Sequence, residues 1–442
     1  MANKKGSGGR KSSNGSRSKA SRTAQKEAVK FAKSHKKGLA IFVCIVLVIV
    51  IAAFLVVYFC FPQIWQRVKD EYAEYTSQFY GDSKDDDPAG TEAKVSDPVP
   101  TGSLADISTA EFSIHFLELG NKYAGDCTLI KCGNTEVLID AGSRTNSAAA
   151  IKSYVDQYCS DGKLEYVIAT HAHQDHIAGF VGTGSGKKTG ILYQYQIGTI
   201  IQFSGRNTNS SVYNNYVKGV EYARENGGAT VYTALECWQG ANATEGARRT
   251  FDLSVAQDSS LTLNVLYNYY YDHQTEDEND YSVCVLLTNK QSESVSTHYL
   301  FTGDLEGKGE EQLLKYNDLP QVELFKGGHH GSKTSSTEAL LNKIKPKNVA
   351  VCCCAGATEY TSNPDNTFPT QAFIDRISVH TENVYCTSLC LDYKQSKFTS
   401  MNGNIVFYMG ADKSFKLWCS NNMVKLKDTD WFKQNRKGWG VG

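Results

Sequence analysis

The chain has 442 residues, 41% of them hydrophobic, and a formal net charge of −1. This length accommodates one large domain with additional segments. Residues 1–38 carry twelve Lys/Arg and one acid, whereas residues 111–442 carry 30 Lys/Arg and 36 Asp/Glu, a net −6. The main region therefore lacks a general cationic field, which excludes a protein that binds nucleic acid through its overall charge.

The N-terminal region predicts a membrane anchor. Residues 39–61, LAIFVCIVLVIVIAAFLVVYFCF, contain no charge, and 23 residues are enough to cross a hydrocarbon core of about 30 Å as a helix. The segment is too long for a signal-peptide core, and no small-residue cleavage site follows it. Basic residues precede it and acids follow it, so we expect residues 1–38 to be a disordered cytoplasmic tail and the rest to face outward.

The remaining chain divides by composition. Residues 62–110 are rich in acids, Pro and Gly and predict a solvated stalk, followed by a folded domain over 111–420 and a C-terminal tail over 421–442. Apolar patterns predict strands at 112–116, 127–131, 136–140, 164–169, 198–203, 261–267, 282–288, 297–302 and 348–353. Helical spacing predicts helices at 146–158, 212–226, 308–315, 336–343 and 370–377. Their alternation indicates a layered α/β architecture.

The most informative motif follows the strand at 164–169. His171, His173, Asp175 and His176 lie within six residues, and buried imidazoles and carboxylates are costly unless they are paired or bind metal. A loop after a strand can direct His171 and His173 to one metal and Asp175 and His176 to a neighbouring one. The pattern therefore predicts a dinuclear metal site.

Two other features are less informative. The segment GTGSGKKTG at 182–190 fails the phosphate-binding pattern, because Val181 stands where the first Gly is needed and Lys188 where Ser or Thr is needed. Eleven of the thirteen cysteines lie outside the expected span, and Cys127/Cys132 and Cys386/Cys390 are candidate pairs, although connectivity cannot be read from sequence. The run Cys352–Cys354 is best interpreted as small buried hydrophobes in a strand.

With its neighbouring motifs, the His cluster resembles the metallo-β-lactamase superfamily over roughly residues 111–410. The stretch Leu138–Gly142 is similar to the first family motif, in which Asp140 supports the His loop from behind the ligands, and Phe301–Asp304 is similar to the fourth, in which Asp304 bridges both metals. The resemblance implies a four-layer αββα sandwich, here preceded by one transmembrane helix, that binds two divalent metal ions, Zn or Mn.

A finer resemblance is to ComEC-type hydrolase domains and to cell-surface phosphorylcholine esterases. It rests on Gly125–Cys127, Asn279–Ser282, Thr302–Glu306 and His329–Ser335, and it implies phosphodiester chemistry. By this resemblance His330 rather than His329 completes the second metal's shell, and Asp175, Asp304 and His330 are the catalytic residues. Side chains expected to contact substrate or support the site are His329, Ser332, Lys333, Thr334 and Ser335.

Two departures from the family pattern concern histidines. Between the first cluster and Asp304 the only candidates for another His ligand are His273 and His298, and neither has a motif around it. Phe368 occupies the position of a late His in the ComEC-type pattern and cannot bind metal. One of the two sites is therefore expected to be incomplete or to rely on water.

These patterns favour a membrane-anchored, outward-facing phosphodiesterase that acts on nucleic acid or an envelope polymer and has no obligate protein partner. Because the domain is acidic, a nuclease would need a local groove, for which candidate cations are Lys187, Lys188, Arg206, Lys326 and Lys333. Hydrolysis of β-lactams is a competing activity, since a fold does not define a substrate. A non-catalytic surface module that binds DNA or envelope polymer is the alternative from a different class.

Overall fold

The computed structural model describes residues 97–183, 188–253 and 260–440. The expected basic tail, the membrane span and most of the stalk lie outside these residues, as does Lys187. Among the described helices, none is long and apolar enough to cross a membrane. The described residues fall within the second of two compact units of the chain, Thr91–Gly442.

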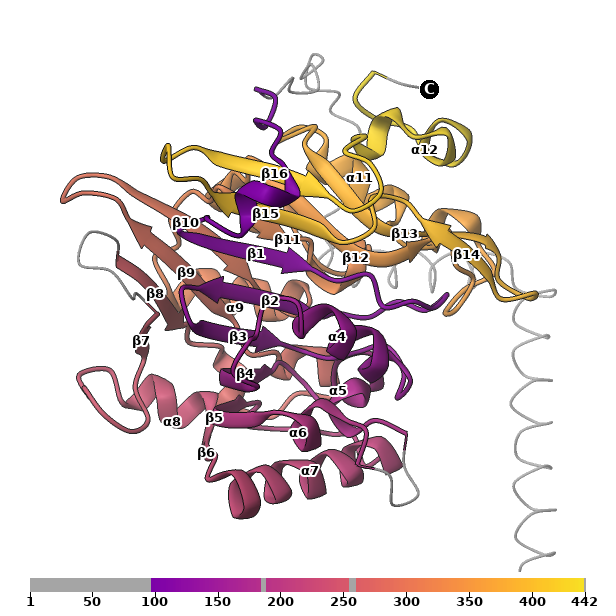
Figure 1. Cartoon of the computed structure of the whole chain (residues 1–442). Helices are drawn as coiled ribbons and strands as arrows, with labels where there is room; N and C mark the ends of the chain where they lie inside the picture. The colour runs from indigo at the N-terminus through magenta and orange to yellow at the C-terminus, as the bar shows by residue number, and fades with distance from the viewer. Residues whose placement is uncertain (1–96, 184–187, 254–259, 441–442) are drawn as a thin grey trace, which may run out of the picture. The chain divides into compact units, whose positions relative to one another are not determined.

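Two mixed sheets of eight strands each form the centre of this unit (Figure 1). Sheet A has the order β16-β15-β1-β2-β3-β4-β5-β6, and sheet B has the order β14-β13-β12-β11-β10-β9-β8-β7. The strands of sheet A are β1 (Phe112–Phe116), β2 (Thr128–Cys132), β3 (Thr135–Ile139), β4 (Lys163–Ala169), β5 (Gln196–Gln202), β6 (Thr230–Thr233), β15 (Ile405–Met409) and β16 (Phe415–Cys419). Those of sheet B are β7 (Thr250–Asp252), β8 (Ser260–Val265), β9 (Val285–Lys290), β10 (Ser296–Phe301), β11 (Leu324–Lys326), β12 (Asn348–Ala355), β13 (Val384–Asp392) and β14 (Lys397–Ser400).

Helices cover the outer faces of the sheets. The α-helices are α3 (Leu104–Ile107), α4 (Ser147–Val155), α5 (Gln174–Val181), α6 (Ile191–Gln194), α7 (Ser211–Gly227), α8 (Ala234–Gln239), α9 (Gly307–Tyr316), α10 (Glu338–Ile344), α11 (Gln371–Ile377) and α12 (Asp430–Asn435). Short 3₁₀ turns are η1 (Tyr269–Tyr271), η2 (Glu278–Tyr281), η3 (Gly328–Gly331), η4 (Pro364–Asn366) and η5 (Leu426–Asp428). Polar caps define the long helix α7, because Ser210 accepts from Tyr213 N and Gly228 ends the helix with a φ of +72°.

The core shows the order of the layers. Along β12, Ala350 and Cys352 belong to the apolar cluster that also contains the sheet A residues, whereas Val349 and Val351 belong to the cluster that contains residues of α9, α10 and α11. Successive residues of a strand point to opposite faces. Phe116 of β1 contacts Phe301 of β10, with ring centroids 6.2 Å apart, so the sheets pack face to face. The predicted two-sheet α/β fold is confirmed, with helices outside each sheet.

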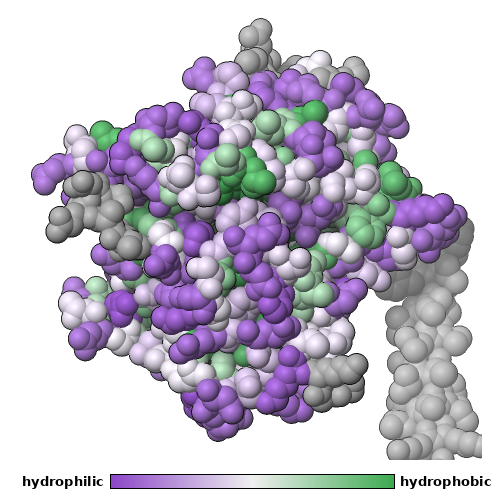
Figure 2. Space-filling model, in the orientation of Figure 1, coloured by the Kyte–Doolittle hydropathy of each residue, from purple (hydrophilic) through white to green (hydrophobic). Residues whose placement is uncertain are grey.

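The ends of the described region are packed against the sheets. Ile107 of α3, within the expected stalk, forms a small buried cluster with Val406 and Tyr408. Phe432 of α12, within the expected C-terminal tail, is buried in the cluster beneath sheet B. Hydrophilic residues cover most of the face seen in Figure 2, with only small separate hydrophobic patches. The apolar side chains of both ends therefore contribute to the core.

No disulfide joins the cysteines of the described region. Cys352, Cys353 and Cys354 are buried, as the sequence predicts. The Sγ of Cys386 lies 3.4 Å from the Sγ of Cys353, on the neighbouring strand, rather than beside Cys390. Neither of the two candidate pairs is bridged. For Cys386 the reason is the parallel pairing of β13 with β12, which brings it beside Cys353.

Candidate metal centre

Strand ends of both sheets deliver the predicted site residues. In sheet A, the parallel strands β3 and β4 end at Ile139 and Ala169, directly before Asp140 and the His loop. In sheet B, the parallel strands β10 and β11 end before Asp304 and His330. The carboxyl ends of neighbouring parallel strands share one edge of a sheet. The carboxyl ends of these strands in the two sheets lie close together, so residues more than one hundred positions apart in the sequence become neighbours.

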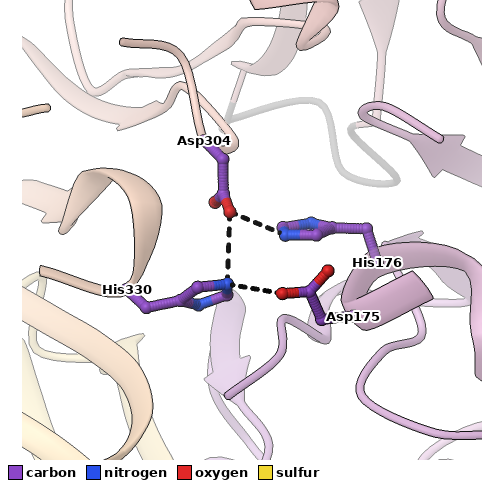
Figure 3. Close-up of side chains that lie close together, drawn as sticks. All are labelled: Asp175, His176, Asp304 and His330. Atoms are coloured by element: carbon purple, nitrogen blue, oxygen red, sulfur yellow. Dashed lines mark hydrogen bonds and ion pairs between the residues drawn. The ribbon is translucent and has the colours of Figure 1, made fainter. Parts of the chain in front are cut away.

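Four of the predicted ligands form a compact group: Asp175, His176, Asp304 and His330 (Figure 3). Asp304 Oδ2 lies 3.0 Å from His176 Nε2 and 3.2 Å from His330 Nε2. His330 Nε2 is also 3.5 Å from Asp175 Oδ2. One ligand atom from each residue lies within 4.8 Å of the others, which is the spacing that a single cation requires of its ligands.

Asp140 supports this group from behind. Its Oδ2 lies 2.7 Å from His176 Nδ1, and its carboxylate accepts from Thr170 N and the Thr170 hydroxyl at 2.8 and 2.7 Å. Burial alone would lower the pKa of His176, but Asp304 and Asp140 raise it well above its ordinary value. Such a carboxylate partner fixes the ring so that Nε2 is the nitrogen available to a metal.

His330 provides the sharpest test of whether a divalent cation fits. Its Nδ1 lies 2.9 Å from the Cys352 carbonyl, to which it donates, and 3.1 Å from Asp126 Oδ1. Its Nε2 is fully buried and has no hydrogen-bond partner among the described residues. It faces the carboxylates of Asp304 and Asp175 at 3.2 and 3.5 Å, without the geometry of a hydrogen bond. Its position among two carboxylates and a second imidazole fits a divalent cation such as Zn or Mn.

His171 and His173 form a second set of donors beside this group. The Nε2 of His171 lies 3.1 Å from the Nδ1 of His173. The Nδ1 of His171 faces the hydroxyls of Thr170 and Ser282 at 3.2 and 3.5 Å. Burial lowers the pKa of His171 well below its ordinary value, with the His176 ring adding to the effect. The neutral imidazole is the form that binds metal.

Lys326 is a component of the centre that the sequence analysis places wrongly. It was expected at a surface groove, but its side chain is only 3% exposed, and Nζ forms ion pairs with Asp126 and with Asp304 Oδ1, the latter at 3.2 Å. Burial alone would lower the pKa of Lys326, but the two carboxylates raise it above its ordinary value. A buried charge must be paired, and Lys326 pairs with carboxylates on both sheets. The only sequence signal for this role was a Lys at the end of an apolar strand.

The other groove candidates also lie elsewhere. The guanidinium of Arg206 packs on Tyr213, with its Cζ 4.2 Å from the ring centroid, in a separate cavity of about 330 Å³. Lys188 Nζ lies 3.7 Å from the ring centroid of Tyr222. Of the described candidates, Lys333 is the one that lines the cavity beside the metal-ligand group. The expectation that Lys188, Arg206 and Lys326 line one groove is therefore wrong, because aromatic rings and buried acids hold these three cations in other places.

A cavity of about 820 Å³ opens over the ligand group. His173 and Asp175 line it, together with Arg144, Gln174 and residues from later in the chain: Glu306, His329, Ser332, Lys333, Thr334, Glu359, Tyr360, Thr361, Asn366, Phe368, Thr370 and Tyr393. The Tyr360 hydroxyl donates to Asp175 Oδ2 at 2.9 Å. The guanidinium of Arg144 pairs with Glu359 at 2.6 Å and lies over Tyr123. Tyr360, Arg144 and Glu359 belong to no sequence motif, so no local pattern marks them as residues of the cavity.

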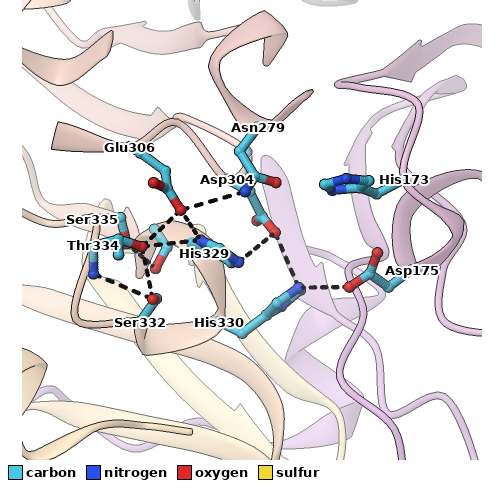
Figure 4. A network of polar contacts seen from close by, with 12 residues as sticks. His173, Asp175, Asn279, Asp304, Glu306, His329, His330, Ser332, Thr334 and Ser335 are labelled. Atoms are coloured by element: carbon cyan, nitrogen blue, oxygen red, sulfur yellow. Dashed lines mark hydrogen bonds and ion pairs between the residues drawn. The ribbon is translucent and has the colours of Figure 1, made fainter. Parts of the chain in front are cut away.

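The residues around His330, from His329 to Ser335, have different environments at the cavity (Figure 4). His329 lines the cavity, with Nδ1 3.1 Å from Glu306 Oε1 and Nε2 3.9 Å from Asp304 Oδ2. Lys333 is exposed. The Ser332 hydroxyl lies 2.9 Å from that of Thr334. Ser335 is buried and donates to the Gly328 carbonyl at 2.7 Å, so the expected contact between Ser335 and substrate is wrong.

The residues that depart from the family pattern have defined places. His273 stacks on Tyr269 with ring centroids 3.7 Å apart, and His298 lies 3.1 Å from the Thr288 hydroxyl within sheet B. Phe368 packs against the His329 and His330 rings at 5.8 and 5.7 Å. In the described part of the chain, the apolar ring of Phe368 therefore occupies the position expected for a late His ligand.

A comparison with protein families agrees with this class of fold. Residues 120–182 match the sequence profile of the Metallo-beta-lactamase superfamily. Among solved structures, MEM-A1, a subclass B3 metallo-beta-lactamase from a soil metagenome library, aligns at 13% identity over 49% of this chain and 80% of its own, with a TM-score of 0.28. The predicted resemblance to the metallo-β-lactamase superfamily is confirmed.

Sequence relatives specify the resemblance within the superfamily. The chain is 39% identical over 72 residues to Recombination protein 2 of Haemophilus influenzae and 39% identical over 82 residues to Competence protein ComA of Neisseria gonorrhoeae. These alignments cover 16% and 18% of this chain but only 8% and 11% of the relatives. ComE operon protein 3 of Bacillus subtilis is 34% identical over 53 residues, 12% of this chain and 7% of the relative. The ComEC-like character predicted from the motifs is confirmed for this segment.

Proposed function

We propose that this chain is a metal-dependent phosphodiesterase that cleaves nucleic acid or an envelope phosphodiester in the cavity above the ligand group. The observation that carries the proposal is the convergence of Asp175, His176, Asp304 and His330 beside the cavity, with the buried Nε2 of His330 facing the carboxylates of Asp304 and Asp175. The names of the relatives, which concern competence and recombination, favour nucleic acid.

Side chains around the ligands orient them to bind divalent cations. Zn and Mn are the candidate metals. When bound, such a cation supplies Lewis acidity and lowers the pKa of a coordinated water toward 7. Asp140 and the Cys352 carbonyl each hold the remote nitrogen of an imidazole, so that Nε2 of His176 and of His330 faces the centre. Lys326 keeps Asp304 in place from the opposite side.

The cavity offers groups that can bind and orient a phosphodiester. Lys333 and Arg144 supply cations, and the hydroxyl of Ser332 supplies a hydrogen-bond donor, whereas those of Thr334 and Tyr360 already donate to Glu306 and Asp175. Phosphate oxygens accept charge-assisted hydrogen bonds from such groups. In this proposal Lys333 binds a non-bridging phosphate oxygen. Asp175 and Asp304 lie on the side of the ligand group that faces the phosphorus.

Membrane attachment is part of the proposal. In this proposal residues 39–61 anchor the chain, residues 1–38 lie in the cytoplasm, residues 62–110 form the linker up to α3, and the domain, with α3 and α12 packed on it, acts outside the membrane. The support is the uncharged length of 39–61 and the charge difference across it. Protease or cysteine-labelling accessibility of the domain in intact cells tests this topology.

The activity is tested with the purified full-length chain. We expect about two divalent cations per chain and cleavage of bis-p-nitrophenyl phosphate. Asp304→Asn and His330→Ala should reduce kcat at least 100-fold, whereas His273→Ala, in an exposed loop, should leave it unchanged. Single-stranded DNA, RNA and a teichoic-acid-type polymer then distinguish the substrates. A chain that binds cations but cleaves none of these would support the non-catalytic binding module instead.

A further inference from the structure

Asn279, in the 3₁₀ turn η2, has a buried side-chain oxygen without a partner. The residue is 7% exposed, and its Oδ1 has no hydrogen-bond partner among the described residues. Its Nδ2 donates to Glu306 Oε1 at 3.4 Å, so the amide orientation is set by an acceptor and leaves Oδ1 as the free group. A buried acceptor without a partner is unfavourable, and a water, a hydrogen-bond donor or a cation would satisfy it.

Contacts on both sides of Asn279 hold it against the histidine loop. Before it, the Glu278 carboxylate accepts from Ala172 N at 3.2 Å. After it, Ser282 Oγ lies 3.5 Å from His171 Nδ1 and accepts from Asp304 N at 3.1 Å. Figure 4 shows the Asn279 side chain beside Asp304, with its oxygen on the side of His173. The free oxygen therefore faces the donors that remain outside the four-ligand group.

The two imidazoles have the spacing of ligands on one ion. Their facing nitrogens, His171 Nε2 and His173 Nδ1, are 3.1 Å apart. Two nitrogens that each lie about 2.1 Å from a shared metal are separated by about 3.0–3.4 Å, from octahedral to tetrahedral geometry. The pair supplies only two ligands, and the described histidines His273 and His298 lie elsewhere. A further ligand has to come from another residue type.

We propose that Asn279 Oδ1 is a ligand of the second cation, together with His171, His173 and Asp304. The inference rests on the proposed metal centre and specifies its second site. An amide oxygen is a hard ligand that suits Mn²⁺ better than Zn²⁺. This site has one carboxylate, which Lys326 also contacts, whereas the group of Asp175, His176, Asp304 and His330 has two. The second site therefore binds its cation more weakly than the first.

Titration of the metal-free full-length chain with Mn²⁺ tests the assignment. Calorimetry and the EPR signal of free Mn²⁺ should show two classes of site in the wild type. Asn279→Ala should weaken the second class at least tenfold and leave the first unchanged. Asn279→Asp, of nearly the same shape, should tighten the second class about tenfold through its added negative charge. Asn289→Ala removes another buried asparagine, in β9, and should change neither class.

The outcomes separate the inference from the proposed function. An unchanged second class in Asn279→Ala, or weakened binding in Asn279→Asp, would overturn the assignment of Asn279. Should Asn279→Ala fail to fold, the Asp variant decides alone. A wild-type chain with one class of site would overturn the inference while leaving a one-metal hydrolase. A chain that binds no Mn²⁺ or Zn²⁺ and has no activity would overturn the proposed function itself.

Discussion

Arg376 of α11 fixes the loop between His330 and α10. Its guanidinium donates to the backbone carbonyls of Ser332, Lys333, Ser335 and Ser336, with N···O distances of 2.8–3.4 Å. One side chain therefore determines where Ser332 and Lys333 stand at the cavity. A lysine has a single ammonium group and cannot reproduce this set of contacts.

We expect Arg376→Lys to raise KM for a phosphodiester about tenfold with a smaller effect on kcat, because the groups that bind phosphate move while the metal ligands stay. Lost hydrogen bonds should also reduce the free energy of unfolding by about 1–3 kcal/mol. Steady-state kinetics and denaturant melts measure both effects. Arg224→Lys, on the exposed face of α7, is the control. Equal KM values in the three proteins would contradict the role of Arg376.

Buried His115, in β1, should make the free energy of unfolding depend on pH. It is fully buried between Ser113 and Tyr154, and burial, assisted by Lys131, lowers its pKa to about 3. Above pH 6.5 both the folded and the unfolded state hold a neutral ring, so the contribution is fully present. Between pH 6.5 and 3 only the unfolded state gains a proton, so stability falls by about 1.4 kcal/mol per pH unit.

His115→Gln removes this proton and should flatten the dependence. Between pH 6 and 4.5 the wild type should lose about 2 kcal/mol more of its free energy of unfolding than the variant. Urea unfolding of both proteins, each with chelator present, measures the difference. His273→Gln, at an exposed position, should behave like the wild type. Parallel curves for wild type and His115→Gln would show that His115 does not contribute to acid destabilisation.

The start of α5 is held by close backbone packing against the loop after β3. Ala141 N donates to His176 O at 2.7 Å, and Asp126 N donates to Asp175 O at 3.1 Å. A Cβ added to Gly142 would lie 1.4 Å from Asp175 O. Only glycine allows this approach, so the position of the Asp175 backbone depends on the absence of a side chain at Gly142.

Gly142→Ala should therefore displace Asp175 and lower the affinity for the first cation at least tenfold, with a lower Tm. Gly227→Ala, at the end of α7, is the matched control, because nothing lies within 4 Å of its added Cβ; its Tm should stay the same or rise slightly. Metal titration and thermal melts report both properties. Unaltered cation affinity in a folded Gly142→Ala protein would contradict this account.

At the scale of elements, the sequence predicts what is local. β4 and the His cluster after it are contiguous in the sequence. The apolar pattern of the strand and the spacing of the histidines are therefore sufficient to predict both. Strands β13 to β16 were not expected: β15 is buried at all five positions and β13 has mixed burial, so neither shows simple alternation. Lys326 and Asn279 acquire their roles only when the two sheets meet, and no local pattern reports that contact.

At the scale of the whole molecule, the candidate metal ligands come from both sheets. Asp175 and His176 follow a strand of sheet A, whereas Asp304 and His330 follow strands of sheet B. A cation bound between them is held only in the folded state, and at 100 times its Kd it adds about 2.7 kcal/mol to the free energy of unfolding. For a domain of this size, that corresponds to a rise in Tm of about 5 °C.

Removal of metal should accordingly lower the Tm of the wild-type chain by about 5 °C, and readdition of Zn²⁺ or Mn²⁺ should restore it. Asp304→Asn provides the sharp comparison, because it weakens the ligand that contacts both sheets while Lys326 keeps its pair with Asp126. Its Tm should respond to EDTA by less than about 2 °C. Scanning calorimetry with and without EDTA measures both proteins. If EDTA lowers the Tm of wild type and Asp304→Asn equally, the cation is bound elsewhere and does not connect the sheets.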